Sequence, residues 1–236
     1  MSIQIPFHTF PPSAPPLLPS ANTTSFCLSP PASHATDIWR KPTNNISNPD
    51  IAISTFNAPI IYKSIPLSKF KRCRVTFTAT YEILYDQGGL VFVLPSEDQG
   101  AGVEGIEKTS KWVKTGVEFV EGRAWVSTVG CDRWADWSLT DAGIVDVPGD
   151  EKRKTVTLEM ERNRVEGTFW IYVIGGDGKR IPLRENTWIL SPEGNGGSPD
   201  REAWVGVFAA TPIMEGRDKD GALSVEFKDW ELELED

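Results

Sequence analysis

The chain is a series of short stretches in which apolar and polar residues alternate, separated by glycine, proline, asparagine and aspartate. Successive side chains of a β-strand point to opposite faces, so this alternation predicts strands that each bury one face. In the stretch RVTFTATYEILY (74–85), Val75, Phe77 and Tyr81 fall on the same side. No periodic pattern predicts a helix longer than two turns. Many short strands in 236 residues predict an all-β fold, a two-sheet antiparallel sandwich or jelly roll.

Turn residues stand where such a fold needs them. Glu121 and Gly122 separate two strand-like runs and predict a hairpin, and the glycine-rich GGDGKR (175–180) predicts a second turn. Near the end of the chain the apolar positions change from odd to even numbers. A β-bulge at Lys228–Asp229 would reconcile the two halves.

Prolines crowd the start of the chain. Proline lacks the backbone N–H and fixes φ, so IPFHTFPPSAPPLLPS (5–20) cannot form a helix or a central strand. We expect residues 1–24 to form a proline-rich arm or a strap along the surface, and residues 25–236 to form the jelly-roll domain.

Charge and cysteine content exclude several classes of protein. A net charge of -9 argues against binding to nucleic acid or to acidic membranes, which require clustered lysine and arginine. No apolar run reaches the ~18 residues of a membrane-spanning helix. The three cysteines form no C-x-x-C pair, so neither zinc nor a disulfide framework is predicted. The odd number of cysteines and the lack of a signal-peptide pattern predict a soluble cytoplasmic protein.

Conventional catalytic centres are also missing from the sequence. Its two histidines, His8 and His34, lie in or near the proline-rich start, which makes a Ser-His-Asp triad or a histidine-rich metal centre improbable. Cys131 has no histidine nearby and is expected to be a buried thiol. No phosphate-binding loop pattern occurs. We therefore expect no metal and no cofactor.

The segment KWVKTGVEF (111–119) carries the main candidate site. Val113 and Val117 share one face of the expected strand, while Trp112, Lys114 and Glu118 share the other with Gly116. The polar face is either an ordinary solvated surface or the floor of a binding groove. The next strand would add either Trp125, Ser127 and Val129 or Val126 and Thr128, and the alternation does not choose between them.

Several stretches resemble a known family in content and order. They are SPPAS, TDIWRK, LYDQGGL, WVKTGVEFVEG, ADWS, VGVFAATP and VEFKDWELE. Together they resemble the regulator-of-enolase-type family, a group of uncharacterised domains in the concanavalin A-like lectin/glucanase superfamily, over roughly residues 25–235. The resemblance implies a jelly roll with one concave face on which superfamily members bind or cleave sugars. It implies no settled activity, because a fold does not carry function with it.

If the strand 111–119 lies on that face, its polar side chains point into the groove. A sugar ring or flat ligand would then rest on the indole of Trp112, with Lys114 and Glu118 bonding to its polar edge. Four further candidates lie near this region, two before the paired glycines and two in the ADWS stretch: Asp86, Gln87, Trp134 and Asp136.

A conventional glycosidase needs two carboxyl groups ~5 Å or ~6.5 to 9.5 Å apart. The corresponding alternation here reads Lys114, Gly116, Glu118 and supplies only one carboxylate. The leading hypothesis is therefore a domain that binds a carbohydrate or a small polyhydroxylated metabolite. The alternative is a metal-independent enzyme of the isomerase, cyclase or lyase type that uses the same groove. A glycoside hydrolase, or a regulatory module with a protein partner, ranks below these two.

Overall fold

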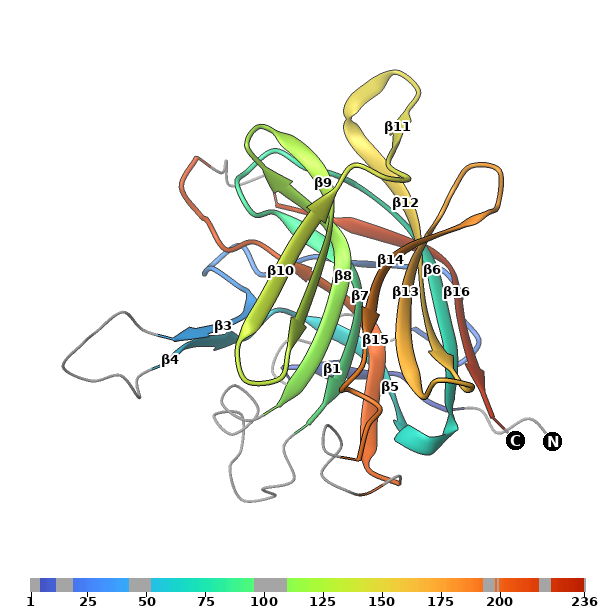
Figure 1. Cartoon of the computed structure of the whole chain (residues 1–236). Helices are drawn as coiled ribbons and strands as arrows, with labels where there is room; N and C mark the ends of the chain where they lie inside the picture. The colour runs from blue at the N-terminus through green and yellow to red at the C-terminus, as the bar shows by residue number, and fades with distance from the viewer. Residues whose placement is uncertain are drawn as a thin grey trace.

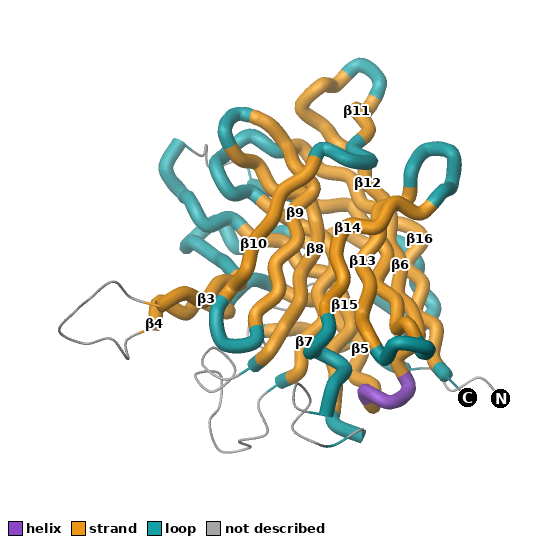
Figure 2. Tube along the Cα trace, in the orientation of Figure 1, coloured by secondary structure: helices purple, strands orange, loops and turns teal. Residues whose placement is uncertain are grey.

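The structure is a computed structural model, and it describes residues 5–11, 19–42, 52–95, 110–192, 198, 200–216 and 222–235. Strands dominate these residues, as Figure 2 shows, and a short 3-10 turn, η1 (Leu67–Lys69), links two of them. Every strand pairing in the described ranges is antiparallel. The predicted all-β class is confirmed.

The first sheet has the strand order β1-β5-β15-β7-β8-β9-β10. Its strands are β1 (His8–Phe10), β5 (Ile60–Pro66), β7 (Gln87–Leu94), β8 (Lys111–Val120), β9 (Arg123–Cys131), β10 (Ala135–Thr140) and β15 (Glu202–Ala210). Neighbours such as β15 and β7 are far apart in sequence, so the sheet is assembled by long-range pairing, as in a jelly roll.

The second sheet faces the first, with the order β14-β13-β12-β6-β16-β2 (Figure 1). Its strands are β2 (Phe26–Leu28), β6 (Phe70–Thr80), β12 (Asp150–Asn163), β13 (Thr168–Ile174), β14 (Arg180–Asn186) and β16 (Val225–Leu234), and β11 (Val145–Val147) pairs with β12. Two further strands, β3 (Ile38–Pro42) and β4 (Ala52–Phe56), pair with each other and form what we call the β3–β4 ribbon. The architecture is a two-sheet jelly-roll sandwich.

The main core lies between the sheets. Phe92 of the first sheet meets Phe70 and Phe169 of the second at ring-centroid distances of 4.9 and 5.0 Å. Val113 and Val117 belong to this core, as the alternation along residues 111–119 allows. Burial of these apolar side chains, worth roughly 25 cal/mol per Å², holds the two layers together.

A second apolar cluster covers the opposite side of the first sheet, which we call the outer face. It joins Ile38 and Phe56 of the β3–β4 ribbon and Phe10 of β1 to Trp112 and Val129 of the sheet. Figure 1 shows the ribbon beside β10, in agreement with the contacts between β10 and β3. The outer face is therefore partly covered by chain from far upstream, and it is not an open surface.

The predicted turns and bulge are confirmed. Glu121 and Gly122 connect β8 to β9 with φ values of 51° and 78°, which are left-handed values typical of tight hairpin turns. Gly178 has φ 79° in the turn between β13 and β14. The pairing of β16 with β6 shifts register between Lys228 and Glu231, and Asp229 has φ 54°. This bulge realigns the two halves of β16 with the core.

Part of the proline-rich start runs along the sandwich. β1 pairs with β5 at an edge of the first sheet, a position where proline can flank a strand. Phe7 contacts the rings of Phe26 and Trp230, and Phe10 contacts Phe56 and Trp204. Residues 7–10 therefore pack against the sandwich, while residues 12–18 lie outside the described residues.

Within the described residues, no helix has the length and apolar character needed to cross a membrane.

Candidate functional site

β8 places Lys114 and Glu118 on the outer face of the first sheet. Pairing in register puts Glu118 opposite Gln87 of β7 and opposite Trp125 of β9. The same register puts Gly116 opposite Ser127, which settles the open choice on β9: Trp125, Ser127 and Val129 share the face of Glu118. The side chains of the candidate site therefore come from three adjacent strands.

Lys114 is a buried lysine with polar partners. Only 3% of the residue is exposed, and its Nζ donates a 2.6 Å hydrogen bond to Oε1 of Gln87. Oδ1 of Asp37 lies 3.5 Å from the same Nζ and 3.4 Å from Nε2 of Gln87, which donates to it. A buried ammonium needs such compensation, because transfer out of water is costly for an unpaired charge.

Glu118 is also buried, with 6% exposure, and is held by a chain of donors. Ser127 Oγ donates to Glu118 Oε2 at 2.7 Å, and the indole Nε1 of Trp137 donates to Ser127 Oγ at 3.0 Å. Burial raises the pKa of Glu118 above its usual value. The Lys114 ammonium and the Ser127 hydrogen bond offset part of that rise, and the charge of Asp37 adds to it.

Three half-buried aromatic rings lie next to this polar cluster. The ring of Trp137 meets Trp39 at 6.1 Å and Tyr85 at 6.3 Å between centroids, with interplanar angles of 84° and 73°. Tyr85 is fixed by its backbone, since it has φ 66° and its N–H donates to the carbonyl of Phe119 at 2.8 Å. Edge-to-face packing is a favourable arrangement for aromatic pairs and holds the three rings in place.

Asp37 and Trp39 are site residues that the pattern on 111–119 did not predict. Both come from the start of the β3–β4 ribbon and flank Ile38, which is fully buried against the outer face. Asp37 is oriented by its backbone N–H, which donates to Oδ1 of Asn57 at 2.8 Å, and its own Oδ1 accepts from the N–H of Ile38 at 2.7 Å. The sequence signal that could have identified them is the alternation of polar Asp37, apolar Ile38 and aromatic Trp39, which is typical of a strand with one buried face.

Asp86 and Gln87, adjacent in sequence, point to opposite faces of the sheet. Gln87 joins the Lys114 cluster on the outer face. Asp86 is 2% exposed and accepts hydrogen bonds from Thr211 Oγ1 at 2.9 Å and from the backbone N–H of Ile83 at 3.3 Å. Asp86 thus fastens the loop before β7 to the end of β15.

Trp112 is placed differently from the sequence expectation of a stacking surface. It shares the face of Lys114, but only 1% of it is exposed, and the Nζ of Lys114 lies 5.9 Å from its ring centroid. Phe208 lies beneath the same ammonium at 5.6 Å. Trp112 therefore forms part of the apolar surface against which Lys114 packs, and its indole is buried.

Trp134 and Asp136 are not brought into the cluster. On β10, Asp136 points away from the side of Trp137, its side chain is 87% exposed, and its nearest basic partner is Arg184 at 3.8 Å. Trp134 is half-buried beneath the guanidinium of Arg133, 5.4 Å from the ring centroid. In the described ranges neither side chain has a hydrogen bond or ion pair with the cluster.

Gly116 lies where two neighbouring strands of the first sheet approach closely. A Cβ at this position would lie 2.2 Å from the carbonyl oxygen of Gly88 and 3.1 Å from Cα of Gly89. The glycine thus allows β7 and β8 to approach closely. No group of His, Cys, Asp or Glu side chains that could hold a metal ion occurs in the part of the chain that the structure describes.

Comparisons with known proteins show a matching family and a related protein. The model of a family described as "Protein of unknown function (DUF1349)" matches residues 20–234. An uncharacterised protein of Emericella nidulans, AN7484, is 42% identical over 201 residues, which cover 85% of this chain and 83% of that protein.

Two solved structures are similar to this chain over most of its length. A functionally unknown protein from Saccharomyces cerevisiae matches with a TM-score of 0.58 and 21% identity, covering 90% of this chain and 97% of the other. At this identity the match shows a shared fold only. Winged bean acidic lectin, complexed with methyl-alpha-D-galactose, matches with a TM-score of 0.49 and 12% identity over 91% of this chain and 95% of the lectin.

Proposed function

The chain belongs to the DUF1349 family of proteins of unknown function, and from that premise we propose that it binds a small polyhydroxylated ligand, a carbohydrate or a related metabolite. The ligand would sit on the outer face of the first sheet, against Trp39, Tyr85 and Trp137. The observation that carries the proposal is the donor chain from the half-buried indole of Trp137 through Ser127 to the buried carboxyl of Glu118. It sets a fixed polar group beside half-buried aromatic rings, a pairing suited to sugar recognition.

The burial of the polar residues favours a small ligand over a polysaccharide. Lys114, Glu118 and Gln87 are each at most 6% exposed, so an extended chain lying across the sheet would not reach them. A single ring could stack on Trp137 or Trp39 and direct its hydroxyl groups to the edge of the cluster. Lys114 and Asp37 would orient the Gln87 amide for such contacts.

The test is a glycan and polyol binding screen that compares the wild type with Trp137→Ala and Asp136→Ala. The two residues are neighbours on β10 and point to opposite faces, so Asp136→Ala is the matched control. We expect at least one sugar to be retained at millimolar concentration by the wild type and by Asp136→Ala, and lost by Trp137→Ala. Retention of no sugar or polyol by the wild type would remove the proposal.

A second candidate function is catalysis without a metal on a small organic substrate. The specific observation is a buried carboxyl of raised pKa, Glu118, in a site that also holds the ammonium of Lys114 and the second carboxylate of Asp37. A carboxyl group whose pKa is raised holds its proton to higher pH and can donate it to a bound substrate. Asp37 adds a second carboxylate to the site, whereas the sequence pattern on 111–119 contained one.

Catalysis is tested by incubating the protein with a metabolite extract and with nitrophenyl glycosides, and following the products by mass spectrometry and absorbance. A reaction that needs both Glu118 and Asp37, and fails in Glu118→Gln and Asp37→Asn, supports an enzyme. Unchanged substrates with the wild type argue for binding alone.

The finer assignment to the regulator-of-enolase-type branch, and with it a regulatory role through a protein partner, is likewise a proposal that rests on the order of the shared sequence stretches.

A further inference from the structure

The polar cluster on the outer face exposes its negative charge more than its positive charge. The side chain of Asp37 is 24% exposed, whereas that of Lys114 is 4% exposed. The ammonium of Lys114 lies beneath the cluster, donates to Gln87, and has Oδ1 of Asp37 3.5 Å away. A ligand that approaches from solvent therefore meets the carboxylate of Asp37 before it meets the ammonium.

Asp37 also keeps one carboxyl oxygen available. Its Oδ1 accepts hydrogen bonds from the backbone N–H of Ile38 at 2.7 Å and from the amide of Gln87 at 3.4 Å. Its Oδ2 accepts no hydrogen bond from any group in the ranges that the structure describes. Both oxygens of a carboxylate are strong acceptors, so Oδ2 can bind a donor of the ligand.

The cluster holds two acidic side chains and one basic one. Glu118 is the second acid, and the charge of Asp37 contributes to the rise of its pKa, which shows that the two carboxyl groups lie close enough to interact. Lys114 balances only one of them. The site therefore has room for one further positive charge.

Trp39 adds an aromatic ring beside the exposed carboxylate. It follows Asp37 by two residues, which is ~6.6 Å along an extended chain, and alternation puts both side chains on the same side. The ring of Trp39 is half-buried and packs edge-to-face with Trp137. Because a cation within ~6 Å of an indole centroid is attracted to the ring, a positive group bound to Asp37 is also stabilised by Trp39.

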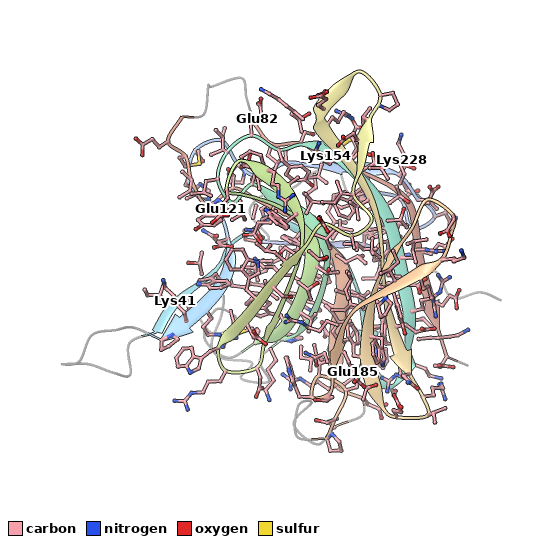
Figure 3. All side chains as sticks on the ribbon, turned by 45° about the horizontal axis from the view of Figure 1, so that its top comes forward. Lys41, Glu82, Glu121, Lys154, Glu185 and Lys228 are labelled. Carbon is pink, nitrogen blue, oxygen red and sulfur yellow. The ribbon has the colours of Figure 1, made fainter. Side chains whose placement is uncertain are left out.

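Three other cations near the outer face have different surroundings. Arg40 is 5% exposed and donates to a backbone carbonyl, and the guanidinium of Arg123 lies 3.4 Å from the ring centroid of Trp125. Lys41, labelled in Figure 3, is exposed on the β3–β4 ribbon, four residues or ~13 Å of extended chain beyond Asp37. None of the three forms an ion pair with Asp37 within the described residues.

From these features we propose that the ligand of this site carries a protonated amino group beside its hydroxyl groups, as an amino sugar or an amino polyol does. The ammonium donates to Oδ2 of Asp37 and lies against the ring of Trp39. This inference rests on the proposed function, because it uses the same cluster and the same rings. The net charge of -9 also favours a cationic ligand over an anionic one.

The test uses the full chain and matched pairs of ligands, at a pH where the amines are protonated. The pairs are glucosamine with glucose, galactosamine with galactose, and 1-amino-1-deoxysorbitol with sorbitol, and the N-acetyl form of each amino sugar removes the charge but keeps the ring. In at least one pair we expect calorimetry to show that the amine binds about tenfold more tightly, which corresponds to ~1.4 kcal/mol. The preference should shrink as salt is added, because salt screens charges near the surface.

Substitutions assign the preference to Asp37. Asp37→Asn should bind the amine and its neutral partner equally, and Trp39→Leu should reduce the preference. The matched control is Asp136→Asn, which removes the same charge from a side chain on the opposite face of β10 and should keep the preference.

The outcomes separate this inference from the proposed function. Neutral compounds that bind as well as their amines, or a preference that survives in Asp37→Asn, would overturn the inference and leave the proposed function standing. Lack of binding by every neutral and amino compound at millimolar concentration would overturn both.

Discussion

The hydroxyl of Ser127 donates a 2.7 Å hydrogen bond to the carboxyl of Glu118 across the β8–β9 pair. Both side chains are buried, and the contact exists because Ser127 lies opposite Gly116, two residues before Glu118 on β8. Because the indole of Trp137 donates to the same hydroxyl, the contact links the titratable carboxyl to the aromatic rings of the candidate site. A measurement of the protonation state of Glu118 therefore reports on the hydrogen bonds of the candidate site.

The first prediction concerns stability against pH. Burial raises the pKa of Glu118 in the folded protein above its usual value near 4.5. Between these two pKa values the unfolded chain binds fewer protons than the folded one, so the free energy of unfolding falls as pH rises through this window. In Glu118→Gln the free energy of unfolding should not decrease in this way as pH rises. Urea unfolding at a series of pH values measures it, and identical pH slopes for the two proteins would contradict the assignment.

The second prediction concerns the hydrogen bond itself. Ser127→Ala removes a donor that favours the charged form, so the pKa of Glu118 should rise further. Carbon-detected NMR titration of the glutamate carboxyl measures the change. Ser138→Ala is the control, since Ser138 is a serine of the adjacent strand that bonds to Arg184 and not to Glu118. A pKa that does not move in Ser127→Ala would show that the hydroxyl does not reach the carboxyl.

Removal of the buried ammonium gives the third prediction. Lys114→Met keeps the length of the side chain but leaves Gln87 Oε1 without its donor, which should lower the free energy of unfolding by about 1–3 kcal/mol. The pKa of Glu118 should also rise, because the positive charge lowers it in the wild type. Lys111→Met on the same strand, where Lys111 pairs with the exposed Asp132, should cost less than about 1 kcal/mol. Equal losses in the two variants would argue against a special role for Lys114.

The close approach of β7 and β8 gives the fourth prediction. Gly116→Ala places a Cβ 2.2 Å from the Gly88 carbonyl oxygen, and the backbone of β7 cannot move away without opening the sheet. We expect a loss of about 1–3 kcal/mol or more in the free energy of unfolding. Gly176→Ala is the control, because a Cβ there meets nothing within 4 Å. Thermal and urea unfolding compare the two, and a Gly116→Ala variant as stable as Gly176→Ala would refute the packing argument.

Local pattern was enough to predict the class of fold, the hairpin at Glu121–Gly122 and the bulge at Lys228–Asp229. It also predicted that Lys114 and Glu118 share a face that excludes Val113 and Val117. These features depend on neighbours within a few residues, because strand periodicity and turn conformations are set locally. The pattern left the partner residues on β9 open, since alternation gives relative facing without register.

The composition of the site came from long-range packing instead. Asp37 and Trp39 reach Lys114 and Trp137 because the β3–β4 ribbon buries Ile38 and Phe56 against the outer face. The same burial covers Trp112, and the side taken by β10 turns Asp136 away from the cluster. Alternation along a strand determines which residues share a face. Apolar burial between segments distant in sequence determines which face is covered and which side chains meet there.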